Sequence, residues 1–167
     1  VGYIKRTAAD TYKAQRRGGK GIMGLTTREE DFVEKLLITS SHDMILFITT
    51  FGRVYSLKGY EIPDAGRTAK GIAIVNLLQL QPDEKVATMI PITGFEDGKY
   101  LVIATKSGII KKTELKAYSN MRKGGLIAVD LRDGDELINA HLVDEGQDIM
   151  IATRKGMSIR FSEKDVR

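Results

Sequence analysis

The sequence contains no cysteine, three prolines and two histidines, and aromatic residues make up 7% of its 167 positions. The absence of cysteine excludes disulfides, cysteine-ligated metals and cysteine nucleophiles. His42 and His141 are far apart in sequence, so a zinc site built from them and distant carboxylates is not expected. No apolar run approaches the ~20 residues of a membrane span, and no signal peptide opens the chain. We therefore expect no metal site and no membrane partner.

The composition is that of one globular domain, with 42% hydrophobic residues and no low-complexity segment. The formal net charge of +4 is modest, but the charges alternate in blocks along the chain. Residues 1–25 and 101–125 each carry a net +5, whereas residues 126–150 carry −6. Such blocks indicate a folded surface with one basic face and one acidic face, and hence a strong local field.

An internal repeat dominates the chain. The segments Ile45–Gly52, Leu101–Gly108 and Ile149–Gly156 each contain four apolar residues, a threonine, two further residues and a glycine. Each continues into a second extended stretch, and a β-rich run, a short glycine turn and a second run are typical of a β-hairpin. Gly2–Arg6 fits the second strand of an earlier copy.

The repeat period predicts the architecture. Equivalent glycines are spaced by 50, 56 and 48 residues at Gly2, Gly52, Gly108 and Gly156. This period suits a four-stranded propeller blade rather than a helical repeat. We predict an all-β fold of roughly three blades, with repeats over 1–43 (first strand missing), 44–99, 100–147 and 148–167 (opening hairpin only). An apolar face is expected to be exposed near the C-terminal end.

Short apolar runs after an acidic turn are interpreted as the last strands of the repeats, at Leu36–Ile38, Met89–Ile90 and Leu142–Val143. Arg28–Leu37 stays ambiguous, because its local pattern also fits a turn or two of helix. The acidic residues of 130–136 lack the spacing of a calcium-binding loop. They are interpreted as a solvated turn.

The most distinctive stretch is the heptapeptide Gln15–Gly21, which holds three cations and three glycines and no apolar side chain. Glycine lets a surface approach the backbone closely, and the planar fork of arginine matches pairs of phosphate oxygens. The composition favours an exposed loop that grips a polyanion. Less basic versions of the loop recur at Arg67–Ile72 and Arg122–Leu126.

This heptapeptide resembles the GyrA box of the C-terminal DNA-wrapping domain of the DNA gyrase A subunit, and the repeats extend the resemblance over the whole chain. The resemblance implies a β-pinwheel, a propeller-like disc whose neighbouring blades exchange strands. It also implies a basic rim that binds, bends and wraps duplex DNA without sequence preference, with the box directing strand passage toward negative supercoiling.

Further expectations follow from the same resemblance. The chain would work in the bacterial cytoplasm beside the gyrase B subunit and the rest of the gyrase A subunit, and would itself be monomeric. The domain would contain no catalytic residue and no cofactor, because ATP and Mg²⁺ serve the holoenzyme of this type II topoisomerase. The related topoisomerase IV domain, which usually carries degraded boxes, is an alternative.

Two groups of residues are predicted to contact DNA. The first is the box: Gln15, Arg16, Arg17, Gly18, Gly19, Lys20 and Gly21. The second is a set of rim cations that recur by repeat: Lys5, Arg6, Arg67, Lys70, Lys106, Lys111, Lys112, Arg122, Lys123, Arg154, Lys155 and Arg160. Duplex DNA presents about one negative charge per 1.7 Å of axis, so a row of cations can follow it without reading bases.

Two other functions are open on the sequence. A propeller-like scaffold could bind an acidic protein partner through the same cations. A nucleotide-using enzyme is the other, because Gly19–Gly24 fits the pattern G-x-G-x-x-G. That fingerprint requires an apolar strand immediately before it, whereas Gln15–Arg17 precedes it here, so the nucleotide hypothesis is disfavoured.

Overall fold

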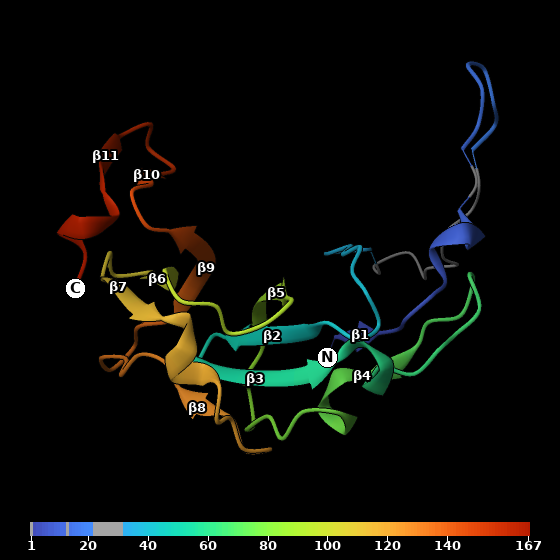
Figure 1. The fold of residues 1–167 in the computed structure, drawn as a ribbon, viewed down its shortest axis with the longest axis horizontal. Coiled ribbons are helices and arrows are strands. Elements are labelled where there is room, and N and C mark those ends of the chain that lie inside the picture. Colours follow the sequence, from blue (N-terminus) through green and yellow to red (C-terminus); the bar gives the residue numbers. More distant parts are fainter. Residues whose placement is uncertain (1, 13, 22–31) are drawn as a thin grey trace.

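The computed structural model describes residues 2–12, 14–21 and 32–167, and these contain β-strands and short 3-10 helices but no α-helix. The strands form antiparallel sheets that follow one another along a curved body (Figure 1). The hairpin near the C-terminus and the loop that holds the box lie at opposite ends of the curve and project to the same side (Figure 1). The predicted all-β class is confirmed.

The central sheet is a four-stranded blade with the order β5-β2-β3-β8. Its strands are β2 (Met44–Thr49), β3 (Arg53–Lys58), β5 (Val86–Ile92) and β8 (Leu126–Ile127). The first three come from one repeat, whereas β8 comes from the next and pairs with the start of β3. The blade is therefore completed by an exchanged strand, as a β-pinwheel requires.

The same exchange occurs at the preceding boundary, where β1 (Tyr3–Ile4) pairs with β4 (Ile72–Ala73). The third sheet has the order β7-β6-β9, from β6 (Lys99–Thr105), β7 (Ile110–Glu114) and β9 (Leu137–Asp144). The strands β10 (Asp148–Ala152) and β11 (Ser158–Ser162) form a separate hairpin. The three predicted hairpins are all present as antiparallel pairs.

Short 3-10 helices lie between the strands in the described ranges. They are η1 (Ala9–Thr11), η2 (Gly59–Glu61), η3 (Ile74–Asn76), η4 (Leu115–Tyr118) and η5 (Glu163–Asp165). Three of them, η2, η4 and η5, directly follow the second strand of a hairpin. Each therefore ends a hairpin at the same place in its repeat.

The central strand β2 buries both of its faces, because successive side chains of a strand point to opposite sides of the sheet. Leu46 and Ile48 join a cluster with side chains of β6 and β9. Ile45 and Phe47 join a second cluster on the other side, with Tyr55 of β3. Burial between two neighbouring blades explains why this strand is continuously apolar rather than alternating.

The prediction of a strand at Leu36–Ile38 is wrong, since the segment forms no strand and Ile38 is 86% exposed. Its counterparts, β5 and β9, each pair with the first strand of their own repeat. The described residues of the first repeat include only the second strand of that hairpin. The predicted runs Met89–Ile90 and Leu142–Val143 do lie in strands, β5 and β9.

Two further expectations concern Arg28–Leu37 and the C-terminal end. Of the segment Arg28–Leu37, residues 32–37 are not helical, and 28–31 lie outside the described residues. Near the C-terminus, Ile149 and Ile151 of β10 pair with Phe161 and Ile159 of β11, so these four side chains share one face of the hairpin. None of them is buried, and Ile159 is 60% exposed. The expected apolar face is therefore present on β10 and β11.

Candidate nucleic-acid interface

The box forms a tight turn within an exposed loop. The Gly19 amide donates to the Arg16 carbonyl at 3.0 Å, and the Gly21 amide donates to Gln15 Oε1 at 2.8 Å. Gln15 therefore closes the loop on itself. The β-turn and the hydrogen bond to the Gln15 side chain fix the backbone of the loop. No apolar side chain is needed, and the heptapeptide contains none.

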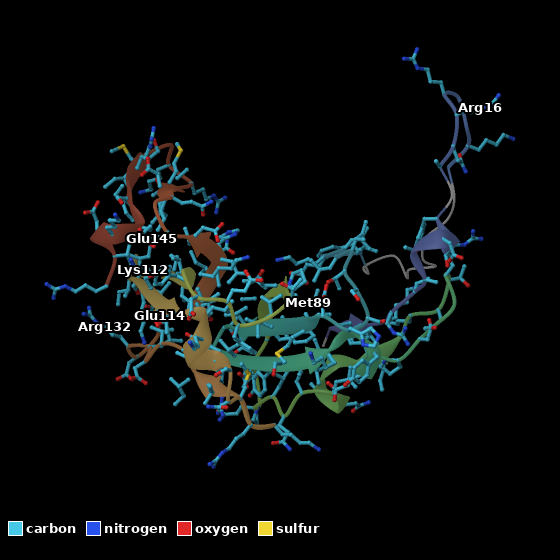
Figure 2. The ribbon with its side chains drawn as sticks, viewed as in Figure 1. Arg16, Met89, Lys112, Glu114, Arg132 and Glu145 are labelled. Carbon is cyan, nitrogen blue, oxygen red and sulfur yellow. The ribbon has the colours of Figure 1, made fainter. Side chains whose placement is uncertain are left out.

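All seven box residues are exposed. Figure 2 shows the Arg16 side chain extending away from the body at the end of the projecting loop. The charged groups of Arg16, Arg17 and Lys20 therefore reach solvent together, and Gln15 serves the shape of the loop instead. The loop can therefore present three cationic side chains to a polyanion along one short stretch of backbone.

The loops of the next two repeats resemble the box in their turns. The Ala69 amide donates to the Gly66 carbonyl at 3.1 Å, and the Gly125 amide donates to the Arg122 carbonyl at 2.8 Å. Each loop leads directly into an exchanged strand, β4 or β8. Strand exchange therefore places both of these basic loops at a boundary between repeats.

Nine of the predicted rim cations are exposed. Seven of them lie on the basic loops or in hairpin turns. They are Arg67, Lys70, Lys106, Arg122, Lys123, Arg154 and Lys155. The ammonium of Lys70 also lies 4.2 Å from the centre of the Tyr3 ring. These cations are placed where a phosphate can reach them.

The five other predicted rim cations contact groups within the chain. Lys5 Nζ donates to the carbonyls of Gly66 and Arg67, Arg6 Nε to Ile62, and Lys111 Nζ to Ala128. Lys112 pairs with Glu163, and Arg160 pairs with Asp148. Because these donors already have partners, a phosphate would have to displace those contacts.

The Lys112–Glu163 pair lies between the third repeat and the last hairpin, with Glu163 buried and Lys112 partly buried. Its nitrogen and oxygen are 2.5 Å apart, and the Glu163 side chain is 2% exposed. The hydrogen bond from Lys112, followed by one from the Gly146 amide, holds the pKa of Glu163 below its ordinary value. The pair therefore joins two repeats rather than forming part of an open basic surface.

The interpretation of 130–136 as a solvated turn is wrong for Asp135, which is 9% exposed. Its Oδ1 accepts the amides of Ser107 and Glu136, each at 2.9 Å. Glu84 occupies the same place in the preceding repeat and accepts the Thr49 hydroxyl at 2.6 Å. The threonine that recurs in every hairpin is the sequence signal that could have pointed to these buried acids.

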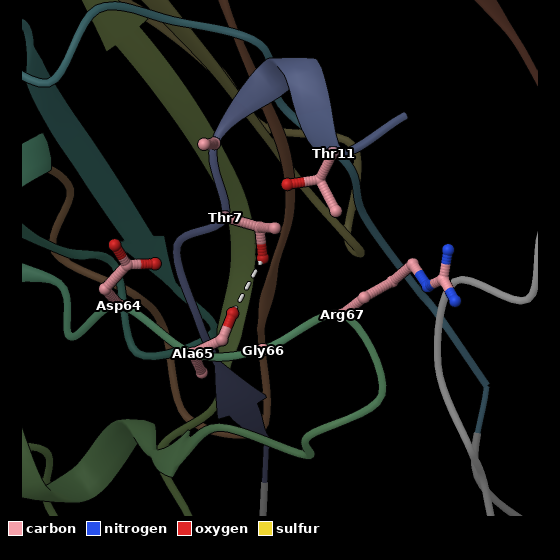
Figure 3. Close-up of a pocket in the computed structure, with 7 residues that line it drawn as sticks. Thr7, Thr11, Asp64, Ala65, Gly66 and Arg67 are labelled. Carbon is pink, nitrogen blue, oxygen red and sulfur yellow. Dashed lines mark hydrogen bonds between the residues drawn. The ribbon is translucent and has the colours of Figure 1, made fainter. Parts of the chain in front are cut away.

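A pocket of about 380 Å³ lies between residues 7–11 and 64–67, beside the second basic loop (Figure 3). On one side Thr7 Oγ1 donates to the Ala65 carbonyl at 3.3 Å. Asp64 lines the pocket together with Arg67. A carboxylate in this position opposes an anion, so we do not assign the pocket to phosphate.

The described residues before the box do not form the strand that the nucleotide hypothesis requires. Of the residues just before the glycines of the box, 14–17 form no strand, and Ile22–Gly24 lie outside the described residues. Among the residues that the structure describes, no three histidine or carboxylate side chains gather as metal ligands. The same ranges contain no helix with the length and hydrophobicity needed to cross a bilayer.

Hairpin repeats that exchange strands, with a basic loop at each boundary, define a propeller-like β-repeat domain. The family model described as the DNA gyrase C-terminal domain, beta-propeller, matches residues 2–40, 43–93, 99–144 and 147–167. The chain belongs to this family, as its resemblance to the gyrase A protein predicted.

Curated relatives agree with this assignment. The chain is 55% identical over 167 residues to the A subunit of DNA gyrase from Clostridium acetobutylicum, covering 100% of this chain and 20% of that protein. It is 48% identical over 165 residues to the corresponding gyrase subunit of Mycobacterium tuberculosis, covering 99% and 20%. The chain thus spans about a fifth of the length of these relatives.

Solved structures share the fold. The C-terminal domain of DNA topoisomerase IV superposes with a TM-score of 0.80 at 29% identity, covering 99% of this chain and 50% of that one. A DNA gyrase A C-terminal domain superposes with a TM-score of 0.76, also at 29% identity, covering 99% and 53%. The β-pinwheel is therefore common to both, and it is the curated relatives that favour gyrase.

Proposed function

We propose that this chain binds duplex DNA through its exposed basic loops and bends it around its curved body, without reading the base sequence. The observation that carries the proposal is the repetition of one loop at successive repeat boundaries. The box is its most basic copy, and all seven of its residues are exposed. Cations repeated along a curved surface can follow the phosphate backbone of a duplex.

Several separate loops suit bending better than one basic patch. Bending a duplex of 20–30 bp costs on the order of 1–6 kcal/mol. Each loop that reaches a further phosphate offsets part of that cost, so binding strengthens as the duplex follows the surface. The two loops after the box add Arg67 and Lys70, then Arg122 and Lys123.

The box has a distinct role in this proposal. It lies on the loop that projects from one end of the curved body (Figure 1). From there it would hold the last bound segment of DNA and set the direction in which the duplex leaves. In the gyrase holoenzyme this would direct strand passage toward negative supercoiling, while DNA cleavage and ATP hydrolysis belong to other domains.

The test is the triple variant Arg16→Ala, Arg17→Ala and Lys20→Ala in the reconstituted enzyme. We expect negative supercoiling to be lost and ATP-dependent relaxation to survive. The matched control removes three lysines outside the basic loops, Lys58→Ala, Lys99→Ala and Lys116→Ala, and so makes the same change in charge. Full supercoiling by the box variant would reject the role of the box.

Salt dependence separates DNA binding from the scaffold alternative. Neutralising three phosphates contributes roughly 2.7 to the slope of log affinity against log salt. The box variant should therefore show a slope shallower by about that amount, again by the counterion-release relation. Should the unmodified chain fail to bind a duplex at low salt, DNA binding itself would be excluded.

A further inference from the structure

Lys5 contacts the basic loop of the next repeat. Its ammonium donates to the Gly66 carbonyl at 3.1 Å and to the Arg67 carbonyl at 2.5 Å. These two carbonyls lie at the turn of the loop, and they are 61 and 62 residues away in sequence. One charged group therefore links two successive backbone oxygens of the loop to the second strand of the preceding repeat.

Other groups of that strand reinforce the link. The Tyr3 ring lies under the Lys70 ammonium, with the nitrogen 4.2 Å from the ring centre. Gly71 has a φ of +90°, and a Cβ placed there would be 2.4 Å from the Ile4 carbonyl oxygen. The end of the loop is thus held against β1 just before β4 begins its pairing.

At the second boundary a cation at a different position of the strand contacts the next basic loop. Arg53 directly follows the hairpin glycine Gly52, as Tyr3 follows Gly2. Its Nη2 donates to the Gly124 carbonyl at 2.6 Å, and its guanidinium lies 5.8 Å from the centre of the Tyr55 ring. A cation of one second strand again contacts a carbonyl in the next basic loop.

We propose that Lys5 and Arg53 are positioning residues for DNA binding, which hold the following basic loop in shape without touching phosphate themselves. This inference rests on the proposed function. The ammonium of Lys5 fixes two backbone oxygens of the loop, and the loop carries the exposed side chains of Arg67 and Lys70. A loop that is already ordered loses less conformational entropy when it binds a phosphate.

The proposal changes the assignment of Lys5 from the sequence. The sequence alone places Lys5 among the rim cations expected to contact DNA. As a phosphate contact it would act independently of Arg67 and Lys70, whereas as a positioning residue it would act only through them. The two roles therefore differ in a measurable coupling between sites.

A double-mutant cycle on the full chain tests this, with a fluorescently labelled duplex titrated at several salt concentrations. The variants are Lys5→Met, the pair Arg67→Ala with Lys70→Ala, and all three together. We expect Lys5→Met to weaken binding about tenfold, the size of one charge-assisted contact. It should have no further effect once Arg67 and Lys70 have been replaced. Lys5→Arg, which keeps the donors, should restore affinity.

Salt dependence supplies a readout that loss of stability alone would not change. A single phosphate contact contributes about 0.9 to the salt slope, and the two cations of the loop about 1.8. Lys5→Met should shift the slope toward the larger change. The control is Lys58→Met. The Lys58 ammonium donates to the His42 carbonyl at 3.3 Å, outside the basic loops, so the affinity of this variant for DNA should be unchanged.

Two results would show that Lys5 is not a positioning residue. Additive effects with a slope change of about 0.9 would make Lys5 a direct phosphate contact, and unchanged affinity of Lys5→Met would leave it no role. If Lys5→Met does not fold, the same cycle is run with Arg53→Gln against Arg122→Ala and Lys123→Ala. Failure of the unmodified chain to bind would instead refute the proposed function.

Discussion

Alanine at Gly52 or at Gly108 tests how one repeat is locked to the next. The two glycines occupy the same place in successive hairpins, with φ values of +74° and +85°. A Cβ at Gly52 would be 2.6 Å from the Val129 carbonyl oxygen, whereas a Cβ at Gly108 would have no described atom within 4 Å. The backbone strain is therefore matched, and only the packing differs.

Backbone strain and packing together set the expected loss of stability in the two variants. Either alanine in the left-handed region costs about 1–2 kcal/mol. At Gly52 the new methyl group must also displace the backbone at Val129, and overpacking of this kind costs roughly 1–3 kcal/mol. The same displacement disturbs the amides of Ala128 and Val129, which donate to the Gly52 carbonyl at 2.8 and 3.3 Å.

Urea unfolding of both variants, followed by far-UV circular dichroism, measures the difference. For a slope of about 1–3 kcal/mol per molar urea, the midpoint of Gly52→Ala should lie roughly 1 M below that of Gly108→Ala, by the packing cost above. Thermal unfolding should show the same order. Equal midpoints would refute the reasoning, since they would mean that the contact at Val129 gives way without cost.

Three further predictions follow from the buried polar groups. Glu84→Gln should lower the free energy of unfolding by about 1–3 kcal/mol, because glutamine has one acceptor oxygen whereas Glu84 uses both of its oxygens, for the Thr49 and the Tyr55 hydroxyl; a urea titration that shows no change would contradict this. Glu163 has a pKa below its ordinary value of 4.5, so its contribution to stability is present above that pH and is lost as the pH falls through the folded-state pKa. Glu163→Gln should therefore flatten the acid limb of stability, measured as urea midpoints from neutral pH downward; an unchanged limb would exclude this pair as its source. Lys112→Met should lower stability and leave the salt slope of DNA binding unchanged, whereas Lys123→Ala should lower the slope by about 0.9; the reverse pattern in salt titrations would place Lys112 on the DNA.

The hairpins were predictable because their signals are local. Each contains an apolar run, a threonine and a glycine within eight residues, and the structure shows β2–β3, β6–β7 and β10–β11 where the pattern recurs. The strand predicted at Leu36–Ile38 failed for the opposite reason. A strand forms only with a partner, and composition alone cannot show whether the partner is there.

The candidate site was predictable in part. The composition of the box indicated an exposed loop, and its seven residues are exposed. The rim cations could not be sorted from the sequence, because Lys5, exposed Lys123 and partly buried Lys112 look alike in a local window. What separates them is the group each meets across a repeat boundary, such as Glu163, which is 51 residues from Lys112.

The sequence by itself determined the unit of this protein, a β-hairpin followed by a glycine-rich basic loop, and it determined that the first loop carries the most charge. Only the tertiary structure decided that β4 and β8 complete the preceding blade, that Asp135 and Glu84 are buried, and that Lys5 holds a loop at Arg67. The reason is physical. Turn and strand preferences act over a few residues, whereas the partner of a charged group is chosen by packing between segments that are far apart in the chain.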